Sequence, residues 1–239
     1  MNVKYFRPRR IGPESRLEDI LLGGLEELFD DYRAPFWMGG AIPIGAGHPD
    51  LVSVWYDPTI LSIPSFTAMD GRILAYLRMA KRAKAETISG RLKCSAKSTM
   101  AALNQLVEAN AVLSNSEIFS VAPIWKQILP KVVTIEAKVT DWKRAVQQAA
   151  RNRLFANRSY VALPEKVARR VRGEKQFKML GIGIIAVEES GTVRVERIAP
   201  WHNTSIWTYY YELASIAATQ MSSTDVIHNN TGRCVPSVS

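Results

Sequence analysis

The chain has 239 residues, enough for one large domain or two small ones, and its composition is that of a globular protein. Its Lys and Arg residues exceed its Asp and Glu residues by nine, which favours a polyanionic partner, either a nucleic acid or an anionic membrane surface. No apolar run reaches the roughly 18 residues of a membrane span, and the three histidines and two cysteines are too scattered to predict a zinc site. We expect a cytoplasmic protein with free thiols.

The N-terminal region is basic and precedes an amphipathic helix. Residues 1–13 contain proline and no apolar segment of the signal-peptide type, which predicts a loosely held arm. A helix is expected from Ser15, and Glu14 and Glu18 share one of its faces because they lie four residues apart. Three arginines of the arm would either contact phosphates or simply be solvated: Arg7, Arg9 and Arg10.

A central strand is predicted at residues 51–55, after a Gly- and Pro-rich stretch at 34–48 that predicts a loop or an irregular strand. Asp50 lies at the start of this strand, directly after Pro49. Because Pro-Asp is common in turns, Asp50 is either an ordinary turn residue or a functional carboxylate.

Three helical patterns and a hairpin follow, at residues 70–84, 86–92, 96–110 and 112–121. This order resembles the winged helix-turn-helix fold over residues 66–122. In that fold the third helix enters the DNA major groove through its N-terminal residues, so the resemblance implies base or phosphate contacts there. The implied contact residues are Arg91, Lys93, Ser95, Lys97, Ser98 and Thr99. The alternative use of such a domain is contact with another protein.

A second buried strand ends on an acid and a base. The β-branched run from Val132 to Ile135 predicts a strand, and Glu136 and Lys138 at its end point the same way because side chains alternate along a strand. Sites of α/β proteins usually lie at strand ends, and a buried strand seldom carries charges unless they pair or bind a metal. An ordinary ion pair at the sheet edge is the alternative, since Glu-x-Lys is a short and common string.

Helices and strands continue to alternate after this point. The predicted elements are helices at 141–153, 165–172 and 204–221 and strands at 159–163, 181–187 and 192–198. The last residues, 222–239, are polar and predict a flexible tail.

Pro49-Asp50 and Glu136-Ala137-Lys138 match the two halves of the PD-(D/E)xK signature, and the chain resembles that nuclease superfamily over residues 14–56 and 130–200. The resemblance implies an α/β, restriction-endonuclease-like core in which helices flank a mixed central sheet. In compact family members a short link joins the two acidic strands, whereas 86 positions separate the acids here; an inserted winged helix would account for the gap. The expected domains are a basic arm at 1–13, the core at 14–64 and 123–221, the inserted winged helix at 65–122 and the tail at 222–239.

The resemblance also implies a Mg²⁺ or Mn²⁺ site. Asp50 and Glu136 would bind the metal, together with the Ala137 carbonyl oxygen, because hard cations prefer oxygen ligands. Lys138 would orient the attacking water and offset the charge of the transition state.

Two further side chains are implied by the resemblance, each with a rival. Glu18 on the first helix, or Glu14, would add a carboxylate to the metal site. Gln148 on the helix after Lys138, or Gln147, would contact the metal-bound water or a phosphate. The implied catalytic residues are therefore Asp50, Glu136, Lys138 and Gln148.

These expectations describe a metal-dependent DNA endonuclease that a winged helix positions on its substrate, in bacterial or phage defence by analogy. Cutting both strands of a duplex would favour a homodimer, a protein partner in a larger complex is a further expectation, and no membrane partner is expected. One alternative is a DNA-binding transcription regulator whose nuclease fold no longer cuts. Another is an interaction subunit of a defence or repair complex. The joint presence of Asp50, Glu136 and Lys138 favours an active enzyme.

Overall fold

The computed structural model describes residues 3–9, 11–29, 35–45 and 47–229. Contacts divide the chain into two units, one made of Met1–Asp57 and Leu129–Tyr210 and the other of Pro58–Ile128 and Tyr211–Ser239. The second unit therefore interrupts the first in the sequence. Within the described ranges, no helix has the length and apolar character needed to cross a membrane.

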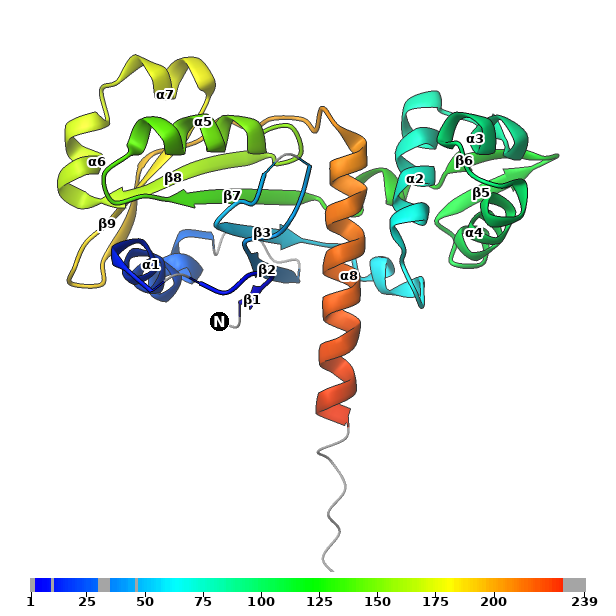
Figure 1. Cartoon of the computed structure of the whole chain (residues 1–239), viewed down its shortest axis with the longest axis horizontal. Helices are drawn as coiled ribbons and strands as arrows, with labels where there is room; N and C mark the ends of the chain where they lie inside the picture. Colours follow the sequence, from blue (N-terminus) through cyan, green and yellow to red (C-terminus); the bar gives the residue numbers. More distant parts are fainter. Residues whose placement is uncertain (1–2, 10, 30–34, 46, 230–239) are drawn as a thin grey trace, which may run out of the picture. The chain divides into compact units, whose positions relative to one another are not determined.

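The first unit has an α/β fold with a mixed seven-stranded sheet (Figure 1). In spatial order its strands are β1 (Lys4–Tyr5), β2 (Phe36–Gly40), β3 (Leu51–Trp55), β7 (Lys131–Ala137), β8 (Arg158–Pro164), β9 (Gly183–Val187) and β10 (Val193–Arg197). The β1–β2, β7–β8 and β8–β9 pairs are parallel, and the other three pairs are antiparallel. One face of the sheet is covered by α1 (Pro13–Phe29), and the other by α5 (Trp142–Asn152), α6 (Glu165–Val171) and α7 (Lys175–Leu180). The expected mixed sheet flanked by helices is present.

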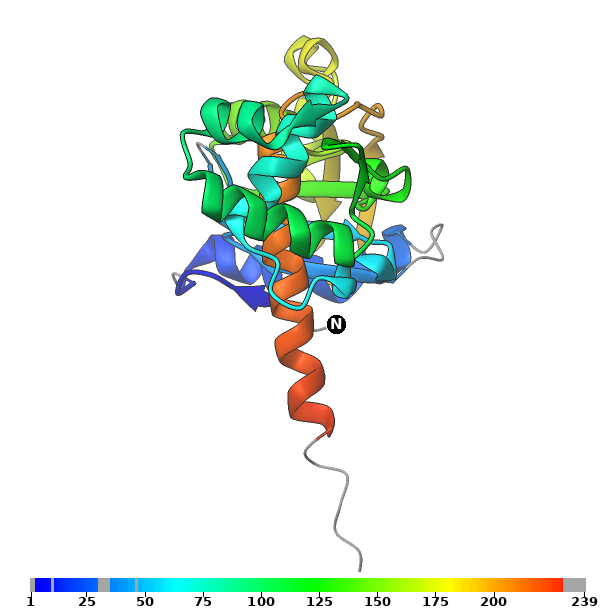
Figure 2. The ribbon, with the colours of Figure 1, turned by 90° about the vertical axis from the view of Figure 1, so that its right-hand side faces the viewer.

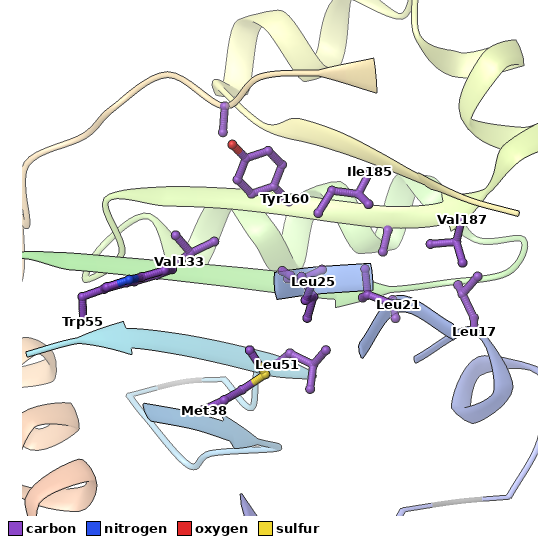
Figure 3. Packing of buried hydrophobic residues seen from close by; sticks show 14 residues of the cluster. Leu17, Leu21, Leu25, Met38, Leu51, Trp55, Val133, Tyr160, Ile185 and Val187 are labelled. Atoms are coloured by element: carbon purple, nitrogen blue, oxygen red, sulfur yellow. The ribbon is translucent and has the colours of Figure 1, made fainter. Parts of the chain in front are cut away.

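Alternation along the central strands creates a separate hydrophobic layer on each face of this sheet. Toward α1, the buried residues include Leu17, Leu21, Leu25, Leu51, Val133, Ile135, Tyr160 and Ile185 (Figure 3). Toward α5, α6 and α7, they include Ala145, Val146, Ala149, Val161, Leu163, Phe177 and Ile184. Because Ile135 and Ala137 of β7 face α1, Glu136 between them faces α5.

The N-terminal arm is held against the first unit, which differs from the loosely held arm that the sequence predicts. β1 pairs with β2, and the Arg9 guanidinium forms an ion pair with Glu18 of α1. Gly40 of β2 is required by this pairing, because a Cβ atom there would collide with the Tyr5 ring. β2 lies in the stretch predicted to be a loop or an irregular strand, and Arg10 lies outside the described residues.

The second unit contains three consecutive helices and a small three-stranded sheet. The helices are α2 (Ala68–Ala80), α3 (Ala85–Leu92) and α4 (Ala96–Glu108); the sheet order is β4 (Ala83–Lys84), β6 (Ile118–Val121) and β5 (Val112–Asn115). Short 3₁₀ turns occupy Pro58–Ser62 and Ile124–Gln127. α2 ends before the predicted residue 84, because Lys81 adopts a positive φ of 68° and the next residues form β4.

The last helix, α8 (Trp207–Asn229), is continuous in both views (Figure 1 and Figure 2). It extends beyond the predicted end at residue 221, so residues 222–229 are helical where the sequence predicts a flexible tail. Ser222 fits within the helix because its hydroxyl donates to the Ala218 carbonyl oxygen at 3.0 Å. Residues 230–239 lie outside the described ranges.

Candidate active site

The pairing of β3 with β7 brings Asp50 beside Glu136. Leu51 pairs with Ile135 in the antiparallel ladder, so Asp50, one residue earlier, lies opposite Glu136. The Ala137 N–H donates to Asp50 Oδ2 at 2.8 Å and fixes this carboxylate at the end of β7. The ladder is intact although the second unit separates the two strands in the sequence. The proximity that the sequence analysis required is therefore observed.

Glu136 is a buried carboxylate with only one of its oxygens hydrogen-bonded. Its side chain is almost completely inaccessible, with 1% of the residue exposed. Asn152 Nδ2, from the end of α5, donates to Glu136 Oε1 at 2.7 Å, whereas Oε2 is buried without a hydrogen-bond partner. Burial, and then the negative charge of Asp50, raise the pKa of Glu136 well above its ordinary value. The fully ionised pair of Asp50 and Glu136 is therefore unfavourable, and a bound proton or a bound cation would relieve its cost.

The Lys138 ammonium lies between acids from two different elements. Its Nζ atom is 3.5 Å from Asp50 Oδ2 and 3.1 Å from Glu14 Oε2 of α1, and it donates to the Ala137 carbonyl oxygen at 3.0 Å. Burial raises the pKa of Asp50, and the Lys138 ammonium partly offsets that rise. Burial alone would lower the pKa of Lys138, but Asp50 and Glu14 raise it. Lys138 thus remains a cation at the edge of the acidic site.

Glu14 and Glu18, which the sequence analysis left as rivals, have different partners. Glu14 meets Lys138, whereas Glu18 accepts hydrogen bonds from Arg9 Nε at 3.2 Å and from the Tyr5 hydroxyl at 3.4 Å. Both line one cavity of about 180 Å³, which also includes Asp50, Arg7 and Arg9. Burial, followed by the charge of Asp50, raises the pKa of Glu18 to about 6. Both acids therefore border the site, but Glu18 is already engaged by the N-terminal arm.

The raised pKa of Glu18 predicts a pH-dependent loss of stability. Folding raises this pKa from 4.5 to about 6, so the stabilisation from the bound proton is complete below about pH 4.5 and is lost as the pH rises to about 6. A Glu18→Gln variant should gain about 1 kcal/mol in unfolding free energy relative to wild type between pH 4 and pH 7, less than the full pKa shift implies because solvent screens this partly buried group. Urea unfolding at both pH values measures this gain, with Glu14→Gln as the control for removal of a neighbouring carboxylate. The same difference at both pH values would contradict the assignment.

On α5, the structure distinguishes between the two predicted glutamines and adds an asparagine. Gln147 is exposed, whereas Gln148 is half-buried and its Oε1 atom is buried without a partner. Asn152 lies four residues after Gln148, on the same face of the helix, and it is the residue that contacts Glu136. Sequence reasoning missed Asn152, although it lies in phase with the buried Ala145 and Ala149. A polar residue in the apolar stripe of a helix was the available signal.

In the second unit, most residues predicted to contact DNA are accessible around the start of α4. Five of them are exposed: Arg91, Lys93, Ser95, Lys97 and Ser98. Ser95 also caps α4, because its Oγ atom accepts the Ser98 N–H at 3.0 Å. Thr99 is fully buried and is not available for the predicted contact. It belongs to the inward stripe of α4 with Leu103 and Leu106.

Metal binding in the first unit would depend on few protein ligands. Among the residues that the structure describes, no three His, Cys, Asp or Glu side chains are grouped so as to hold a metal ion, and Glu18 is bonded to Arg9. The pair of Asp50 and Glu136 still fits a hard cation, because Glu136 Oε2 is buried and lacks a partner. Mg²⁺ commonly binds one or two carboxylates and keeps several waters.

The match to the PD-(D/E)xK signature rests on this chain's own residues. Asp50 directly precedes β3, Glu136 lies in β7 and Lys138 directly follows β7, and the three residues meet at one edge of the sheet. No protein-family model, curated protein or solved structure matches the chain.

Proposed function

We propose that the protein is a metal-dependent nuclease that hydrolyses phosphodiester bonds of DNA. The observation that carries the proposal is the buried Glu136 carboxylate, which has an unpartnered oxygen and lies opposite Asp50 with the Lys138 ammonium at its side. A structural ion pair would not require a buried Glu136 beside a half-buried Asp50, because each carboxylate adds a desolvation cost that one ammonium does not remove. Proteins commonly keep such unfavourably placed charged groups, with their shifted pKa values, at functional sites.

The residues at this edge can divide the work of hydrolysis. Asp50, Glu136 and the Ala137 carbonyl oxygen would hold Mg²⁺ or Mn²⁺, which when bound polarises the phosphate and lowers the pKa of a bound water. Lys138 places a positive charge beside the carboxylates and can offset the negative charge that develops on the phosphate. Asn152 orients Glu136 through its hydrogen bond. Gln148, with a buried free oxygen on the same helix face, could position the water or a phosphate.

The two units support the same proposal. A mixed sheet with helices on both faces and acids on adjacent strands is compatible with a restriction-endonuclease-like core. In the second unit, three helices followed by a hairpin are compatible with an inserted winged helix, with exposed Lys and Ser side chains at the start of α4. The proposed role of the second unit is to bind duplex DNA, and that of the first unit is to cut it.

Cleavage of supercoiled plasmid and linear DNA tests the proposal directly. Wild-type protein with Mg²⁺ or Mn²⁺ should nick the plasmid, and a chelator should stop the reaction. A Glu136→Ala/Lys138→Ala variant should bind DNA and leave it intact, because both substitutions lie in the first unit at the site. DNA binding without cleavage by either protein would replace this proposal with a non-cutting regulator. Absence of both activities would favour a protein-interaction subunit.

A further inference from the structure

The positive charge of this chain is concentrated in one segment. Residues 142–180 contain eleven Lys and Arg residues and two Asp and Glu residues, a net charge of +9, which equals the net charge of the whole chain. The remaining 200 residues therefore contain twenty residues of each sign. The surplus that favours a polyanionic partner is thus a property of α5, α6, α7 and their connections.

These three helices form a single layer on the face of the sheet opposite α1 (Figure 1). The Trp142 ring of α5 stacks on the Phe177 ring of α7, with 5.6 Å between ring centroids, and holds these two helices together. Seven cations of these three helices are exposed and form no ion pair with any described residue: Lys143, Arg144, Arg151, Lys166, Arg170, Lys175 and Lys178. The outer surface of the layer is therefore an uncompensated basic surface.

This basic surface begins at the candidate active site. β7 and β8 are parallel, so they end at the same edge of the sheet, and α5 and α6 follow directly from those ends. Asp50, Glu136 and Lys138 lie at that edge, and α5 contacts Glu136 through Asn152. A polyanion at the site would meet repulsion from the carboxylates there, and neighbouring cations would be needed to hold it.

We propose that the outer surface of α5, α6 and α7 binds the phosphate backbone of nucleic acid and holds it at the acidic edge; the inference rests on the proposed nuclease function. Cations spread over three helices suit a ligand with regularly repeated charges. Gln147 lies exposed between Lys143 and Arg151 on one stripe of α5 and adds the amide donor that phosphate contacts also use. The surface supplies affinity and register, and it does not read sequence.

Salt-dependent DNA binding in the presence of chelator tests this surface separately from catalysis. The test variant is Lys143→Ala/Arg151→Ala/Arg170→Ala. Its matched control removes three exposed cations from outside the layer, Lys4→Ala/Arg16→Ala/Lys126→Ala. Fluorescence anisotropy with a labelled duplex of about 30 base pairs, at about 50 to 200 mM salt, gives the Kd and its salt slope.

The layer variant should weaken binding by about 10- to 100-fold and should reduce the slope of log Kd against log salt by about 2 to 3, close to 0.9 for each lost phosphate contact. The control should stay within about threefold of wild type. Equal losses in the two variants would overturn the inference. So would a larger effect of the layer substitutions on binding to phosphatidylserine vesicles or polyglutamate than to duplex DNA.

Failure of this inference and failure of the proposed function give different results. DNA binding that depends on the layer, without metal-dependent cleavage, would support the nucleic-acid-binding role of the basic surface and contradict the proposed nuclease function. Cleavage by wild type, together with unchanged DNA binding by the layer variant, would support the proposed nuclease function and contradict the role of the basic surface in DNA binding. Correct folding of both variants is checked by circular dichroism and thermal unfolding, since all six substituted side chains are exposed.

Discussion

A Glu136→Gln variant should lose metal-dependent cleavage and, at the same time, become more stable than wild type. Gln keeps the shape of Glu and can still accept the Asn152 amide through its carbonyl oxygen. It removes a carboxyl group whose Oε2 atom is buried without a partner, and its amide can donate toward Asp50. Removal of such a buried, unsatisfied group is worth about 1–3 kcal/mol of unfolding free energy. Loss of a preorganised charge from the site should reduce cleavage by about 10³-fold.

The gain in stability should depend on pH and on metal. Folding raises the pKa of Glu136, so a proton bound to Glu136 stabilises the folded protein. Wild type loses this stabilisation as the pH rises through the folded pKa. The variant should therefore exceed wild type in unfolding free energy most at high pH and least at low pH. Mg²⁺ should raise the unfolding temperature of wild type and leave that of the variant nearly unchanged.

Urea and thermal unfolding in chelator and in Mg²⁺ measure these effects, beside plasmid cleavage. The control is Glu189→Gln, an exposed carboxylate, which should change stability by less than about 0.5 kcal/mol. A variant that is less stable than wild type at every pH would show that Glu136 is a structural partner of Asn152. Cleavage by the variant at the wild-type rate would show that Glu136 does not take part in catalysis.

The helices and strands predicted from the sequence are those that a local pattern of apolar residues is enough to determine. The apolar runs of β3 and β7 and the amphipathic pattern of α5 were sufficient to predict these three elements, because residues that pack on or within a sheet need such patterns. β1 was not predicted, and an irregular strand was only one of two alternatives for the stretch that contains β2, because the pairing of the two strands depends on the distant contact between Tyr5 and Gly40. α7 escaped because it has only six residues.

The candidate site shows the same limit. Glu136 and Lys138 were singled out at the end of a predicted strand and Asp50 through the resemblance to the PD-(D/E)xK signature, and the observed ladder brings them together. Asn152 was missed, because its role depends on how α5 packs on β7. The resemblance to a winged helix implied that Thr99 contacts DNA, yet the phase of α4 turns its side chain inward. Motif and position therefore name candidates, whereas tertiary packing decides which of them are accessible.

A Lys138→Met variant should abolish cleavage while metal binding persists. Met is close to Lys in length but has no charge, so it removes the ammonium that lies 3.5 Å from Asp50 and 3.1 Å from Glu14. The carboxylates that would hold the metal remain, whereas the positive charge that offsets charge on the phosphate is lost. We expect cleavage to fall by about 10²- to 10³-fold, a size typical of losing one such stabilising group.

The metal dependence of stability distinguishes this loss from misfolding. Without Lys138, Asp50 keeps its burial but loses its nearest cation, so the pKa of Asp50 should rise further and the protein in chelator should be less stable at neutral pH. A bound divalent cation can replace the missing positive charge, so Mg²⁺ should raise the unfolding temperature of Lys138→Met more than that of wild type. Lys126→Met, at an exposed position, serves as the control. Near-normal cleavage by Lys138→Met would mean that this ammonium only neutralises the acids of the sheet edge, and the assignment of the site would then rest on Asp50 and Glu136 alone.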